Sequence, residues 1–192
     1  MSISMNPLDW NFKGIYVKAS QQHPIIDGTG WKFSFSPKHI EYINTRKFDR
    51  LKLGQTLTMT FQVVQSPDVV FEYGFGPGNM GLRPANVRFY IQYGLSLSNF
   101  ANTRWWSNPV SCDLVEAGDK VTLSVGLNPG EWSNIWGHMG NEDAKTIKGF
   151  NLALAKAGKI GITFGGGSFF GHGVWLSQGS ATFKMKEYKI GG

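Results

Sequence analysis

The residues of this chain best suited to chemistry are aromatic rings and planar polar groups. Seven tryptophans occur among 192 residues, and several stand close to arginine, glutamine or histidine. An indole face can stack on the apolar side of a sugar ring, while guanidinium and amide groups can bond its hydroxyls. These residue types therefore indicate the recognition of a glycan.

The first of two candidate sites is a sheet face. Arg88, Tyr90 and Gln92 alternate with Val87, Phe89 and Ile91 along one predicted strand. Because successive side chains of a strand point to opposite faces, the three polar residues share a face that could be concave and could hold a ligand.

The second candidate site lies where loops meet at one end of the fold. Loop 74–84 holds four glycines and two prolines, and Trp106 and His172 would reach the same end. Trp105 and Trp106 are neighbours, so on a strand they point to opposite faces and Arg104 lies on the side of Trp106. The sequence leaves both candidate sites open.

The remaining tryptophans complete the candidate set. Trp132 and Trp136 are four residues apart and are expected to share a face, and Trp175 follows a turn in which two glycines flank His172. A packing role in the core is the alternative for each tryptophan. The candidate ligand-binding residues are Arg88, Tyr90, Gln92, Arg104, Trp106, Trp132, Trp136, His172 and Trp175.

Patterns typical of catalysis or metal binding are missing. The chain has no Gly-x-Ser-x-Gly elbow, and the glycines at 165–167 lack the Lys-Ser/Thr of a phosphate loop. The four histidines lie far apart, and no strand carries the paired carboxylates of a sandwich glycosidase. We therefore expect no catalytic residue, no metal and no cofactor. A polysaccharide lyase is a lesser alternative, because Arg88, Tyr90 and Gln92 match in type the residues such enzymes use.

The charge distribution and the N-terminal residues limit the partners and locations that we expect. The net charge is +6, with a pI of about 9.4, but the basic residues are scattered and form no dense stripe, which argues against nucleic acid. Cys112 is the single cysteine, so no internal disulfide forms. Residues 1–7 lack a signal-peptide pattern and no apolar run could span a membrane. We expect a cytoplasmic or virion-associated protein.

Hydrophobic periodicity predicts a single all-β domain over residues 1–192. Many short segments alternate apolar and polar residues, most clearly 55–65, where Leu57, Met59, Phe61 and Val63 share one face. This pattern favours an antiparallel β-sandwich resembling a jelly roll, with an up-and-down barrel as the alternative.

One segment has helical spacing instead. Ile147, Phe150, Leu154 and Ala157 recur at intervals of three and four, which predicts a short amphipathic helix over about 142–157, capped by Asn141. We expect this helix to cover a sheet edge or one end of the sandwich.

The last third of the chain predicts paired core strands. Six of its residues should point inward: Ile160, Ile162, Phe164, Ala181, Phe183 and Met185. The glycines from 165 to 173 would form a turn that presents His172 at the edge of these strands.

Several segments together resemble bacterial and phage jelly-roll domains similar to carbohydrate-binding modules. They include Arg-Trp-Trp-Ser at 104–107 and Trp-Ser-Asn-Ile-Trp-Gly at 132–137, with 86–90, 160–167 and 179–183. The resemblance implies a sandwich that binds a glycan without cleaving it. Such modules are often joined to enzymes by a linker, and the chain shows neither a linker nor a catalytic partner.

Three functions are therefore expected in order. The first is non-catalytic binding of a glycan or polysaccharide by exposed aromatic residues. The second is a structural or surface role in a virus or phage particle, acting through contacts within a homo-oligomer. The third is the lyase.

Overall fold

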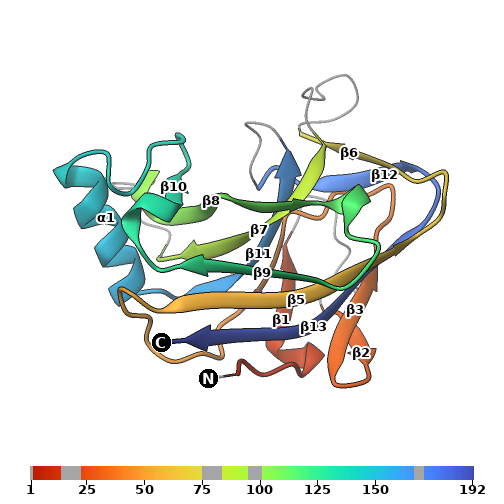
Figure 1. The fold of residues 1–192 in the computed structure, drawn as a ribbon, viewed down its shortest axis with the longest axis horizontal. Helices are drawn as coiled ribbons and strands as arrows, with labels where there is room; N and C mark the ends of the chain where they lie inside the picture. The colour runs from red at the N-terminus through yellow and green to blue at the C-terminus, as the bar shows by residue number, and fades with distance from the viewer. Residues whose placement is uncertain (1, 14–22, 75–83, 95–100, 167–170) are drawn as a thin grey trace.

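Two antiparallel β-sheets face each other, and one α-helix packs at an end of the sandwich (Figure 1). The computed structural model describes residues 2–13, 23–74, 84–94, 101–166 and 171–192. The all-β sandwich expected from the alternating pattern is confirmed.

The larger sheet has six strands in the order β1-β4-β11-β7-β8-β10. Their bounds are β1 Trp10–Lys13, β4 Tyr42–Thr45, β11 Lys159–Gly166, β7 Ala85–Gln92, β8 Arg104–Asp113 and β10 Trp132–Asn134. Strands β11 and β7 are therefore central, and every residue of β7 is buried.

The second sheet has five strands in the order β2-β3-β13-β5-β9. Their bounds are β2 Ile25–Asp27, β3 Gly30–Ser34, β13 Ala181–Gly191, β5 Thr56–Gln65 and β9 Val121–Gly126. A separate pair joins β6 (Val70–Tyr73) to β12 (Val174–Gln178). Three short 3₁₀ helices complete the described elements: η1 Pro7–Asp9, η4 Leu114–Glu116 and η5 Pro129–Glu131.

The chain passes repeatedly between the two sheets, from β3 to β4 and on to β5, and from β8 to β9 and on to β10. These crossings give the jelly-roll-like connectivity that the sequence predicts. Among the residues with described positions, no helix is both long and apolar enough to cross a membrane.

Aromatic packing joins the two sheets. Phe183 on β13 is fully buried. Its ring centroid lies 5.0 Å from that of Phe61, 5.6 Å from that of Phe33 and 5.7 Å from that of Phe164 on the opposite sheet. Tyr188 adds a hydrogen bond between the sheets, because its hydroxyl donates to the Gly161 carbonyl at 3.2 Å. All six residues predicted to point inward from the last third of the chain are buried.

Helix α1 spans Ala144–Ala155 and begins slightly later than expected. Its N-cap is Asp143 and not Asn141. The Asp143 carboxylate accepts from the Thr146 backbone N–H at 2.7 Å, and the Thr146 hydroxyl accepts from the Asp143 N–H at 3.0 Å. This reciprocal capping box satisfies backbone donors that an Asn141 cap would leave free, which is why the helix starts here.

The buried face of α1 centres on Phe150, whose ring lies 5.2 Å from that of Trp105 and 6.1 Å from that of Trp132. This contact rotates Ile147 away from the core, and the side chain is 40% exposed. The assignment of Ile147 to the buried stripe was therefore wrong, while Phe150 and Leu154 are buried as expected.

Replacement of Phe183 by alanine tests the aromatic junction between the sheets. The Phe183→Ala variant should lose about 3–5 kcal/mol of unfolding free energy, because it leaves a cavity that rigid neighbours cannot fill. Guanidinium unfolding followed by circular dichroism measures the loss. Lys184→Ala, one residue along on the outward face, should change stability by less than about 0.5 kcal/mol. Equal effects of the two variants would contradict this account of the core.

Candidate functional site

A second cluster of buried aromatic residues lies on the outer face of the six-stranded sheet, the face turned away from the five-stranded sheet. It contains Tyr42 on β4, Tyr90 on β7 and Trp106 on β8, and Ile135 packs against it. The ring centroids of Tyr42 and Tyr90 are 4.5 Å apart, and those of Tyr90 and Trp106 are 6.2 Å apart. This outer cluster forms an aromatic floor.

Gly161 allows the two tyrosine rings to meet. Strand β11 separates β4 from β7, so the rings contact each other above β11. On that face β11 places Gly161, which has no side chain, between Asn44 and Tyr90, and it places Thr163 opposite Tyr42. A Cβ at Gly161 would also overlap the Ile43 carbonyl oxygen, so the backbone itself requires glycine here.

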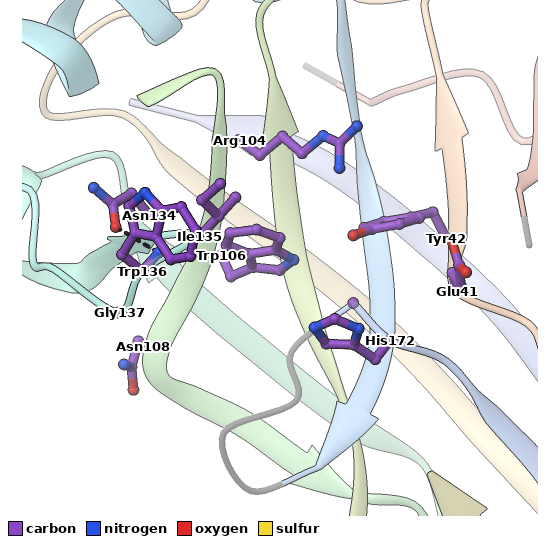
Figure 2. Close-up of a pocket in the computed structure, with 11 residues that line it drawn as sticks. Glu41, Tyr42, Arg104, Trp106, Asn108, Asn134, Ile135, Trp136, Gly137 and His172 are labelled. Carbon is purple, nitrogen blue, oxygen red and sulfur yellow. Dashed lines mark hydrogen bonds between the residues drawn. The ribbon is translucent and has the colours of Figure 1, made fainter. Parts of the chain in front are cut away.

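A pocket of about 710 Å³ opens above this floor. Figure 2 shows Trp106 between two walls, with Trp136 and Asn108 on one side and Tyr42, Glu41 and His172 on the other. The described lining residues are Glu41, Tyr42, Arg104, Trp106, Asn108, Asn134, Ile135, Trp136, Gly137, Gly171 and His172. The Arg104 side chain extends from β8 across the face toward Tyr42 (Figure 2).

Trp136 stands on a tight turn at the rim of the pocket. The Gly137 N–H donates to the Asn134 carbonyl at 3.0 Å, and Gly137 adopts a positive φ of 81° that closes the turn. The buried Asn134 side chain braces the loop, because its Oδ1 accepts from the N–H groups of Trp136 at 2.9 Å and His138 at 3.2 Å. The turn thus holds in place an indole that is 70% exposed.

The Asn108 side of the pocket comes from a bulge in β8. Arg88 pairs with Ser111 and Tyr90 pairs with Trp106, so residues 107–110 stand opposite Phe89 alone. The Ser107 hydroxyl takes the place of the backbone hydrogen bonds that the bulge interrupts. It accepts from the Phe89 N–H at 3.1 Å and donates to the Val110 carbonyl at 2.6 Å. The extra residues turn Asn108 toward the pocket.

Gly171 packs closely against two residues of the pocket floor, Tyr42 and Trp106. Its φ is 71°, and a Cβ there would overlap the Tyr42 hydroxyl and lie 3.0 Å from Trp106 Nε1. Trp106 Nε1 is buried and has no hydrogen-bond partner in the described part of the chain. The nearby indole lowers the pKa of Tyr42 as a minor effect, although its Nε1 and the Tyr42 hydroxyl do not meet at hydrogen-bonding geometry.

Burial sets the protonation states of the pocket. It raises the pKa of Tyr42 to about 12, against the smaller lowering effect of Arg104, and raises the pKa of Tyr90 well above its ordinary value. Burial also lowers the pKa of His172. At neutral pH both phenols are therefore protonated and the imidazole is neutral. The two phenols and the imidazole are therefore uncharged hydrogen-bonding groups.

Four of the predicted site residues line this pocket: Arg104, Trp106, Trp136 and His172. They come from the sheet face and from the turns around it. The pocket therefore combines parts of the two candidate sites, the sheet face and the loop end. Loop 75–83, expected to contribute, lies outside the described residues.

Arg88, Tyr90 and Gln92 lie on the outer face but beneath the surface. Tyr90 is 1% exposed and donates from its hydroxyl to Gln92 Oε1 at 2.7 Å. Arg88 is buried and donates to Asn86 Oδ1 at 3.0 Å and to the Ser107 carbonyl at 3.2 Å. None of the three lines the pocket: Tyr90 is the buried middle of the aromatic floor, and Arg88 and Gln92 flank it on the same strand.

Trp132 and Trp175 also lie away from the pocket lining. Trp132 is fully buried in β10 and donates from Nε1 to the Gly126 carbonyl at 2.7 Å. The turn after β10 separates it from Trp136, so the expectation that the two indoles share a face was wrong. Trp175 is buried on β12 and stacks on His39 with ring centroids 4.1 Å apart.

Several lining residues were not identified from the sequence. Tyr42 begins the short strand β4 and Glu41 directly precedes it, with no motif at either residue, and Asn108 depends on the bulge. Asn134 had a usable signal, because an asparagine three residues before a glycine is typical of a turn. Among the described residues, no group of three or more His, Cys, Asp or Glu side chains is placed to hold a metal ion.

Neither a protein-family model nor a curated protein sequence matches the chain. Among solved structures, it is similar to a protein described as a xylan-binding module, CBM15. The match covers 96% of this chain and 95% of that one, with 13% sequence identity and a TM-score of 0.48. That protein is of the class that the tryptophan-containing segments resemble.

The brace formed by Asn134 can be tested by amide hydrogen exchange. In the Asn134→Ala variant, the Trp136 and His138 amides lose their acceptor and should exchange roughly tenfold faster, as expected for one lost hydrogen bond. The Gly137 amide is the internal control, since it donates to the backbone carbonyl of residue 134, which the substitution keeps. The Phe183 amide reports any global loss of stability. Unchanged exchange at Trp136 and His138 would show that the side chain does not brace the turn.

Proposed function

We propose that the protein is a non-catalytic glycan-binding β-sandwich and that the pocket on the outer face of the six-stranded sheet is its binding site. The observation that carries this proposal is the exposed, braced indole of Trp136 at the rim of a pocket lined by polar groups.

Trp136 differs from every other tryptophan of the chain. Trp10, Trp31, Trp105, Trp106, Trp132 and Trp175 are all buried, whereas Trp136 is largely exposed. Keeping an indole in water costs free energy that a bound apolar surface would recover. The C–H face of a sugar ring is such a surface, and a fixed turn lowers the entropy lost when the two stack.

The polar groups of the pocket suit sugar hydroxyls. Glu41 can accept hydrogen bonds, Arg104 can donate them, and the Asn108 amide can do both. The neutral His172 ring supplies one donor and one acceptor. A site with flat aromatic faces and several groups of mixed hydrogen-bonding character recognises a polyhydroxylated ligand better than a wholly apolar one.

Binding without cleavage is favoured by the state of the candidate catalytic groups. The Tyr90 hydroxyl and the Gln92 amide are buried and bond each other, so they are not available to abstract a proton as a lyase requires. Glu41 is the one carboxylate among the described lining residues, and a glycosidase of the usual type needs two.

Replacement of Trp136 by alanine tests the binding site. Stacking that removes about 100 Å² of indole from water is worth about 2.5 kcal/mol at about 25 cal/mol per Å². The Trp136→Ala variant should therefore bind its glycan roughly tenfold to a hundredfold more weakly. A glycan array finds the ligand, and calorimetric titration of wild type and variant measures the loss. Ligand should also shift the tryptophan emission of the wild type but not of the variant.

Leu8→Ala is the matched control, because Leu8 is likewise 70% exposed and lies outside the pocket. It should bind as tightly as the wild type. The proposal fails if no glycan on the array binds, or if Trp136→Ala and wild type bind with the same affinity.

A further inference from the structure

We propose that the ligand of this pocket is an acidic glycan, one that carries carboxylate or sulfate groups. This inference rests on the proposed function and adds the charge class of the ligand. It is carried by a group of cations that the fold gathers beside the pocket: Lys13, Arg46, Arg104 and Lys159.

Strand register places three of these cations in a row across the outer face. Lys159 on β11 pairs with Gln92 on β7, and Gln92 pairs with Arg104 on β8. Arg46 directly follows Thr45, the partner of Ile160, so it lies beside Lys159. Since neighbouring strands are about 4.8 Å apart, the row spans about 15 Å. Its Arg104 end lines the pocket.

Lys13 extends the group to the other wall. Its Nζ lies 5.8 Å from the centroid of the Tyr42 ring, which forms part of the pocket floor. This is within the range of a cation–π contact. The ammonium group is therefore held over the same face as the row.

The cations act on one another electrostatically. Burial lowers the pKa of Lys159, and Arg46, Lys13 and Arg104 lower it further. Burial likewise lowers the pKa of Lys13, with a further lowering by Arg104 and an opposing effect of Glu41. The chain thus places like charges close together at a cost, with Glu41 as the one acidic group that acts on them in these interactions.

Lys13, Arg46 and Lys159 form no ion pair with any described residue. An acidic ligand would supply the missing negative charge, and its hydroxylated ring would still reach Trp136. Guanidinium groups match the two oxygens of a carboxylate or sulfate, so Arg104 is suited to bond the acid group of a sugar in the pocket.

The test compares glycans that differ in charge but share a backbone. Suitable pairs are polygalacturonate with its methyl ester, carboxymethyl cellulose with hydroxyethyl cellulose, and dextran sulfate with dextran. We expect the acidic member of at least one pair to bind about tenfold more tightly than its neutral partner. The pair that responds identifies carboxylate or sulfate. Added salt should weaken this preference, because the screening length falls from about 30 Å at 0.01 M to about 3 Å at 1 M.

Lys159→Gln should weaken binding of the acidic glycan about threefold to tenfold and leave its neutral partner unaffected. Lys184→Gln removes the same charge from the outward face of the opposite sheet and should have no effect. If both variants lose equal affinity, the attraction is nonspecific and the inference is wrong. It is also wrong if neutral glycans bind as tightly as acidic ones, a result that leaves glycan binding itself intact. Absence of binding to any glycan would instead refute the proposed function together with this inference.

Discussion

The six-stranded sheet buries side chains on both of its faces, and the site depends on this constraint. Its inner face packs on the five-stranded sheet through rings such as Phe164 and Phe183. Among the described residues, the centre of its outer face is covered by side chains of the sheet itself. Tyr42 and Tyr90 close over Gly161, and Trp106 extends the cover. The pocket exists because this aromatic cover is wide enough for a floor and leaves the turns around it to form walls.

Rigidity is the common property of these walls. The Trp136 turn is tied by Asn134, the Asn108 segment by Ser107, and the His172 turn by the close approach of Gly171 to Tyr42. Each wall is therefore fixed by a buried neighbour and not by the ligand. A surface prepared in this way loses little entropy on binding, which suits the glycan site that we propose.

Much of the fold could be predicted from the sequence, because alternation in strands is a local property. Periodicity alone predicts the inward residues of segment 55–65 and of the last third, and these residues are buried. The site was harder to predict. Tyrosine and arginine alternate with apolar residues in the same way whether their side chains line a pocket or are buried beneath it. The sequence therefore could not distinguish Arg88, Tyr90 and Gln92 from lining residues.

Contacts between segments far apart in the chain explain the other differences. Asn108 reaches the pocket through a bulge that has no sequence signature, and Ile147 faces outward because Phe150 is held by Trp105 and Trp132. Strand pairing also explains why the cluster of positive charge could not be predicted from the sequence. Lys13, Arg46, Arg104 and Lys159 are scattered along the sequence, and strand pairing brings them to one face.

The bulge at residues 107–110 has a consequence for how this site can diversify. The regular ladder resumes on both sides of it, and the Ser107 hydroxyl already serves the Phe89 amide in place of a partner strand. Residues can be gained or lost within such an insertion without a shift of the register that carries the core. The pocket wall can therefore change at this one short segment while the sandwich stays the same, and under the proposed function such a change would alter which ligand the pocket accepts.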